Sequence, residues 1–116
     1  MVGLLGHARE MALASNVTLE ITASALRYLP GAIEYSAAGA HSGGLHNNRD
    51  FVESCVHMDA SIPAEIQALL YDPQTSGGLL ISLPAADAEK FLQARTESYI
   101  IGTVTERQTK PLEIKP

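Results

Sequence analysis

The spacing of the apolar residues changes at Asn16, and this change constrains the fold more than any other feature. Before Asn16 the apolar side chains recur at helical spacing and form one stripe, at Leu4, Leu5, Ala8, Met11 and Ala12. In residues 17–22 apolar and polar residues alternate, which is typical of a strand with one buried face. Asparagine tolerates the left-handed backbone that ends many helices. We therefore expect a helix that ends at Asn16, followed by a half-buried strand.

Helical and extended patterns continue to alternate along the rest of the chain. Helices are expected at residues 30–38, 61–71 and 84–95, each opened by a proline in or near its first turn. The apolar face of the third helix comprises Ala88, Phe91, Leu92 and the stem of Arg95. Strands are expected at residues 51–58, 79–83, 99–105 and 112–114.

The patterns also predict where some strands lie in the sheet. The apolar run 79–83 suits a central strand, and residues 112–114 suit an edge strand. The short polar connection 106–111 predicts a hairpin, hence an antiparallel pair, between the last two strands. Neither a repeat nor a linker interrupts the alternation. We therefore expect one α+β domain over residues 1–116, with helices packed on a single sheet.

Composition excludes several classes of function. The chain has 116 residues, 46% of them hydrophobic and 18% charged, which is the balance of a globular domain. Its eight basic residues are scattered and its net charge is −5, so nucleic acid is not an expected partner. No apolar run approaches the ~20 residues that span a bilayer. The N-terminus lacks the features of a signal peptide, and the single cysteine, Cys55, suits a reducing compartment. We expect a cytoplasmic protein.

The most informative stretch is DPQTSGGLL, at residues 72–80. Pro73 fixes one backbone dihedral, and Gly77 and Gly78 can adopt positive φ or let another backbone come close. A loop whose amides point one way, flanked by the hydroxyls of Thr75 and Ser76, can hold an anion such as phosphate. On residue chemistry alone, a tight turn between a helix and a strand is the commoner use of such a segment.

Other reactive residue types favour plain structural roles. His41, His46, His57 and Cys55 match no standard zinc spacing. Cys55 has no basic neighbour in the sequence except His57 and is expected to be a small packed residue. Arg49 beside Asp50 could be a solvated ion pair, but the neighbouring asparagines and glycines make it a candidate anion contact.

The stretch DPQTSGGLL resembles the signature of the selenophosphate synthetases, and three further stretches resemble that family in the same order. They are GLLGHAREM at residues 3–11, LPGA to AAG at 29–39, and IIGTV at 100–104. The resemblance implies the C-terminal half of the PurM-like architecture, an α+β domain with a mixed sheet between helices. Members of the family make selenophosphate from selenide, ATP and water, and release AMP and phosphate.

The resemblance also implies what this chain lacks. The family works as a homodimer with magnesium, and its nucleotide is bound mainly by an N-terminal domain that also carries the nucleophilic cysteine or selenocysteine. Its magnesium-ligating aspartate precedes the first helix. We therefore expect no catalytic and no metal-ligating residue here, no cofactor on the isolated domain, and the enzyme's own N-terminal domain as partner. The surface exposed by its absence is expected around Leu4 and Leu5.

The resemblance gives the site residues as well. Thr75, Ser76, Gly77 and Gly78 are expected to line the phosphate end of the site. The family's PGGTxRN loop is matched by residues 42–49 in altered register and without its threonine, so Asn48 and Arg49 come next. Two alternatives remain: another ATP-dependent PurM-like enzyme such as aminoimidazole ribonucleotide synthetase, and a non-catalytic binding or dimerisation module of the same fold.

Overall fold

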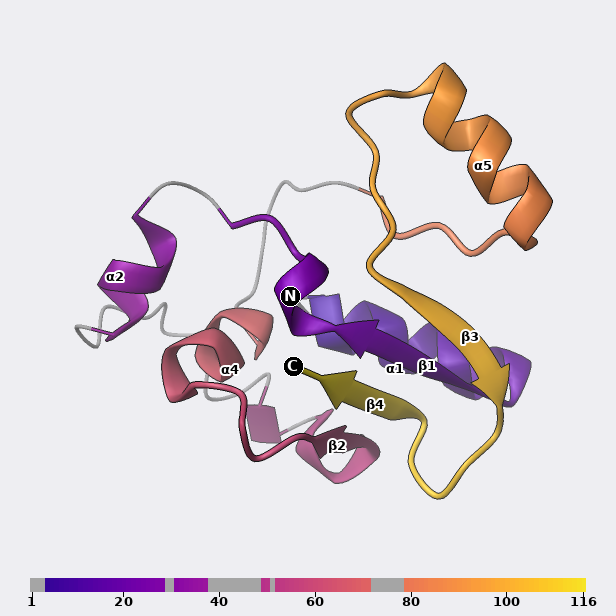
Figure 1. Ribbon diagram of the computed structural model, residues 1–116. Helices are drawn as coiled ribbons and strands as arrows, with labels where there is room; N and C mark the ends of the chain where they lie inside the picture. Colours follow the sequence, from indigo (N-terminus) through magenta and orange to yellow (C-terminus); the bar gives the residue numbers. More distant parts are fainter. Residues whose placement is uncertain (1–3, 29–30, 38–48, 51, 72–78) are drawn as a thin grey trace.

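The protein is described by a computed structural model that covers residues 4–28, 31–37, 49–50, 52–71 and 79–116 (Figure 1). Its helices are α1 (Leu4–Ser15), α2 (Ala32–Ala37), α4 (Ala64–Tyr71) and α5 (Ala85–Ala94), with short 3-10 turns η1 (Ala23–Ala25) and η2 (Glu53–Cys55). The strands are β1 (Val17–Thr22), β2 (Val56–Met58), β3 (Gly102–Glu106) and β4 (Leu112–Lys115).

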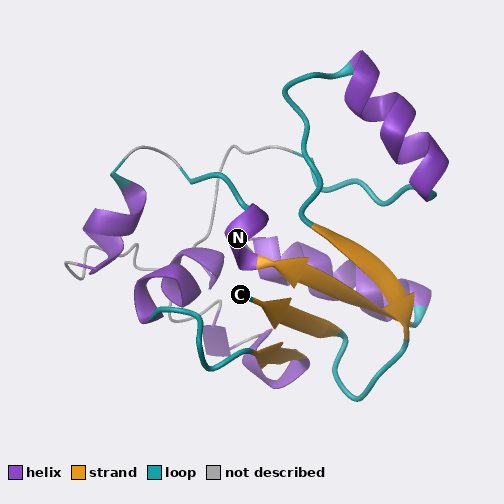
Figure 2. Cartoon of the chain, viewed as in Figure 1, coloured by secondary structure: helices purple, strands orange, loops and turns teal. Residues whose placement is uncertain are grey.

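The four strands form one mixed sheet in the order β2-β4-β1-β3 (Figure 2). Strand β4 runs parallel to both of its neighbours, β1 and β2, whereas β3 runs antiparallel to β1. Helix α1 lies behind the sheet in the view of Figure 2 and packs on β1 and β4. The predicted α+β class, with helices on a mixed sheet, is confirmed.

The predicted hairpin between the last two strands is wrong, because β1 lies between β3 and β4. The connection between them instead wraps around the start of β1, where Thr18 is fully buried. The Thr18 hydroxyl donates to the Lys110 carbonyl oxygen at 2.9 Å and accepts from the Gln108 amide at 2.8 Å. Residues 112–114 are therefore central rather than at the edge, with Leu112 and Ile114 fully buried.

The expected helix-to-strand junction is confirmed at Asn16, which has a φ of 52° between α1 and β1. The α1 stripe faces the core, and Leu5 is fully buried. The prediction of an exposed patch at Leu4 and Leu5 is therefore wrong. The exposed large apolar side chains are elsewhere, at Leu13, Ile33, Leu79, Ile81, Leu83, Ile100 and Val104.

Two predicted strands differ from the structure. Residues 79–83 have no regular structure, and Leu79 is 88% exposed although Leu80 packs against the core. No described strand pairs with residues 79–83, and β4 occupies a central position in the sheet. Among the described residues of the predicted strand 51–58, only Val56–Met58 is extended, because the exposed Glu53 and Ser54 break the alternation and belong to η2.

Helix α5 confirms the prediction of a helix after Pro84 but not its packing. None of its residues is buried, and Arg95, the C-cap residue, is exposed. Ala88, Phe91 and Leu92 are half-buried, while the rest of the helix is exposed. Figure 1 shows α5 standing apart from the sheet at the end of two extended connections.

Candidate functional site

Arg49 is the one predicted site residue that the described part of the chain includes. It lies on a short helical stretch whose residue Val52 is buried, which anchors the stretch to the core. Its guanidinium lies over the ring of Tyr71, with 5.0 Å between Cζ and the ring centroid. A cation over an aromatic face is attracted by the ring's electron density, so this contact holds Arg49 against the end of α4.

The contact between Arg49 and Tyr71 joins the described ends of both predicted segments. Arg49 follows Asn48 directly in the chain, and Tyr71, the last residue of α4, precedes Asp72 directly. The described residues that adjoin Asn48 and Asp72 in the chain therefore lie side by side, at one corner of the described fold. Asn48, Thr75, Ser76, Gly77 and Gly78 themselves lie outside the described residues.

Tyr71 is part of the core at this corner. It is only 4% exposed, and burial raises the pKa of its hydroxyl above the ordinary value of 10.0. The Arg49 charge acts in the opposite direction and lowers that pKa, while the Glu53 carboxylate raises it. The corner thus presents one guanidinium held on a neutral, buried ring, which suits the binding of an anion rather than proton transfer.

A second polar arrangement lies on the sheet and was not predicted. His57 Nδ1 lies 3.0 Å from Glu113 Oε2, and Lys115 Nζ lies 2.8 Å from Glu20 Oε1. The strand register sets Glu113 opposite both His57 and Glu20. The alternation of these residues with buried Leu19, Leu112 and Ile114 was the sequence signal that could have found them.

The electrostatics of this sheet face are those of surface ion pairs. The Glu20 carboxylate hydrogen-bonds Lys115 and raises the pKa of its amine. The pKa of Asp59 is lowered by hydrogen bonds from the Ser61 hydroxyl and amide, and further by His57. His57 and Lys115 have side-chain exposures of 64% and 55%. Exposed pairs of this kind contribute little to stability, and we assign them no catalytic role.

Cys55 has a basic neighbour that the sequence did not reveal. Arg9 Nε, from α1, donates to Cys55 Sγ at 3.3 Å, although the two residues are 46 positions apart. In the sequence His57 is the basic residue near Cys55, whereas in the fold Arg9 contacts it as well. The thiol is partly exposed rather than packed away.

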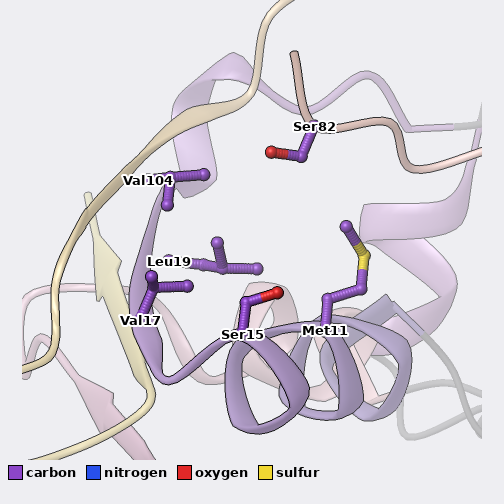
Figure 3. Close-up of a pocket in the computed structure, with 6 residues that line it drawn as sticks. All are labelled: Met11, Ser15, Val17, Leu19, Ser82 and Val104. Carbon is purple, nitrogen blue, oxygen red and sulfur yellow. The ribbon is translucent and has the colours of Figure 1, made fainter. Parts of the chain in front are cut away.

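A cavity of about 90 Å³ lies between α1 and the sheet and is shown in Figure 3. Its lining is mainly apolar, with two serine hydroxyls: Met11, Ser15, Val17, Leu19, Ser82 and Val104. Among the described residues, no charged side chain lines it, and Arg49 does not. It therefore does not suit an anion.

Nowhere in the described ranges do three histidine, cysteine, aspartate or glutamate side chains come together in a way that could hold a metal ion. Among the same residues there is no helix both long and apolar enough to cross a bilayer.

Comparison with known proteins gives a consistent family. The family model described as "AIR synthase related protein, C-terminal domain" matches residues 1–115. A protein named selenide, water dikinase from Clostridium botulinum (strain Eklund 17B / Type B) is 42% identical over 118 residues, which cover 97% of this chain and 34% of that protein. Proteins of the same name from Clostridioides difficile and Treponema denticola are 39% and 34% identical, with the same two coverages. The chain thus spans about a third of the length of these relatives.

Proposed function

This chain belongs to the family of AIR synthase related C-terminal domains, and we propose that it is the C-terminal domain of a selenide, water dikinase. One observation carries the proposal: 42% identity over 97% of this chain, confined to 34% of the relative. The dikinase name recurs among the relatives at 34–42% identity, which favours this enzyme over aminoimidazole ribonucleotide synthetase.

The reaction we propose for the whole enzyme makes selenophosphate from selenide, ATP and water, with release of AMP and phosphate. Residues 1–116 form a single domain that works beside an N-terminal, ATP-binding domain, and the whole enzyme is a cytoplasmic homodimer. One observation supports this division: the chain spans about a third of the length of its relatives.

The part of the site that this chain contributes is the phosphate end. Thr75, Ser76, Gly77 and Gly78 supply hydroxyls and close-approaching backbone amides, and Asn48 and Arg49 add an amide and a guanidinium. The Arg49–Tyr71 contact supports this grouping, because both segments meet the described fold there. A guanidinium presents a planar fork of donors that matches phosphate oxygens.

The described residues fit one of the two implied ligands. Arg49, held on the Tyr71 ring, suits the phosphates of ATP, which supplies the phosphoryl group when bound. Among the residues with described side chains there is no group of three that could hold magnesium. From the family resemblance we propose that magnesium is bound mainly by the N-terminal domain, and that this chain orients the phosphates and excludes water around them.

A chimaera tests the function directly. The matching 118 residues of the Clostridium botulinum relative are replaced by this chain, and AMP and selenophosphate are measured with ATP, magnesium and selenide. We expect selenide-dependent AMP release from the chimaera and none from the 116-residue chain alone.

Two controls make the result decisive. The unmodified relative gives the reference rate, and thermal unfolding of the chimaera shows that its two parts are folded. A folded chimaera that binds ATP but releases no AMP contradicts the proposal and favours a non-catalytic module. Full turnover by the isolated chain contradicts the proposed division between two domains.

A further inference from the structure

The cavity between α1 and β3 has a mainly apolar lining. Met11 and Ser15 of α1 form its floor in Figure 3, Val17, Leu19 and Val104 form one wall, and Ser82 lies opposite. Its volume of about 90 Å³ is close to that of one large apolar side chain. Val104 is 49% exposed beside it, so the cavity opens at the edge of the sheet.

Helix α5 carries an apolar face that covers no core. Ala88, Phe91 and Leu92 lie at i, i+3 and i+4 and therefore share one side of the helix. The remaining positions of the helix, from Ala85 to Ala94, are exposed. Phe91 and Leu92 do not pack against the described core, whereas the half-buried Met11 and Leu80 do. An amphipathic helix of this kind is stabilised when its apolar face is covered.

One connection of α5 begins at the cavity, and the other leads to the start of β3. Ser82 lines the cavity only three residues before Ala85, the first residue of α5. On the other side Ile101 packs against the core directly before β3. Between these anchors lie Leu83–Pro84 and residues 95–98, which can change their dihedrals without breaking a strand. Leu79, Ile81, Leu83 and Ile100 of the same arm are also exposed.

We propose that α5 docks on the cavity of its own chain, with the Phe91 side chain filling it. The apolar face of α5 lacks a partner in the described core, and the lining of the cavity is mainly apolar. The two surfaces are therefore chemically complementary. Short connections give a tethered helix an effective concentration in the ~millimolar range, so its own chain outcompetes a second copy in dilute solution. Leu79 directly follows Gly78, so docking also fixes the chain next to the DPQTSGG stretch.

Cross-linking tests the docking and identifies the occupant. In a Cys55→Ser background, Ser15→Cys at the cavity is paired with Ala88→Cys on the apolar face of α5. The matched control pairs Ser15→Cys with Ala86→Cys, which lies about 200° around the same helix from Ala88. With a short bismaleimide and micromolar protein, we expect an internal link in the Ala88 variant to form about tenfold faster than in the control.

Equal rates for the two pairs would overturn the docking, because they would mean that α5 has no preferred face toward the cavity. A covalent dimer as the main product would also overturn it, since the occupant would then be a second copy. Phe91→Ala provides a second measurement: it lowers the unfolding midpoint by about 10 °C if Phe91 is docked. A shift equal to that of Lys90→Ala, on the exposed side of α5, contradicts the proposal.

Discussion

Two apolar segments of this chain occupy opposite positions in the fold. Leu112 and Ile114 of β4 are fully buried between two strands, whereas Leu79, Ile81 and Leu83 are exposed in a segment without a strand partner among the described residues. Their hydrophobicity is similar, so it does not explain the difference. Backbone pairing does: β4 forms ladders on both sides, with β1 and β2. A short strand between two partners is buried, and an unpaired apolar run is not.

The largest loss of stability is expected from a substitution in β4. Leu112→Ala removes a fully buried side chain and leaves a cavity in the middle of the sheet, which costs about 2–5 kcal/mol of unfolding free energy. Leu79→Ala, the same substitution at a position that is 88% exposed, is expected to change it by less than about 0.5 kcal/mol. Urea unfolding of both variants measures the difference in unfolding free energy. Equal losses would contradict the different burial of the two segments.

A smaller loss is expected where β3 meets β1. A Cβ at Gly102 would overlap the carbonyl oxygen of Glu20, because Gly102 pairs with Ile21 in close contact with β1. Gly102→Ala should therefore separate the two strands locally and cost about 1–3 kcal/mol, as other overpacking substitutions do. Thr103→Ala, at the next and exposed position, is the control. An unchanged unfolding midpoint for Gly102→Ala would show that β3 shifts freely at the edge.

Substitution of Thr18 is expected to cost less unfolding free energy than substitution of Leu112 or Gly102. Thr18→Val removes the hydroxyl that bridges the Gln108 amide and the Lys110 carbonyl oxygen. Because those two groups lie in a partly exposed loop, water can replace the lost bonds, and the cost is about 1–1.5 kcal/mol. Thr18→Ser keeps the hydroxyl and should recover most of the stability. If both variants are equally stable, the bridge does not hold the 107–111 connection on β1.

The smallest effect on stability is expected from the titration of Tyr71 at high pH. Burial raises the pKa of Tyr71 in the folded chain above its unfolded value of about 10. The unfolded chain thus loses this proton first, so the contribution is fully present below pH ~10 and is lost as the pH rises through the folded pKa. Lys115 acts in the same direction. Tyr71→Phe should flatten the fall in stability above pH 10, as measured by urea midpoints, and an unchanged slope would contradict it.

The elements that the sequence predicted well are those with local signals. The helical stripe before Asn16 and the alternation after it needed no partner to be recognised, and α1 and β1 have the expected bounds. The α4 helix likewise ends at Tyr71, before Asp72-Pro73. The family followed from nine consecutive residues, 72–80, and the comparisons confirm it.

Most of the failures concern interactions between distant residues. The position of β4 depends on Thr18, some ninety residues away, which captures the 107–111 connection. The exposure of 79–83 depends on which strands pair, and the Arg9–Cys55 contact on how α1 packs near η2. Of the predicted site, only Arg49 is described, and its place on the Tyr71 ring had no sequence signal. A periodicity finds the faces of elements but not their neighbours.

The functional proposal requires that the Arg49–Tyr71 corner faces bound phosphate. Steady-state kinetics of Arg49 variants in the chimaera test this claim. Losing a hydrogen bond to a charged group costs about 1.5–3 kcal/mol, so Arg49→Ala should lower kcat/KM for ATP by about ten- to a hundred-fold. Arg49→Lys, which keeps the charge but not the fork, should lie between. Unfolding midpoints measured in parallel separate a binding role from a structural one. Normal kinetics for Arg49→Ala at unchanged stability would contradict the claim.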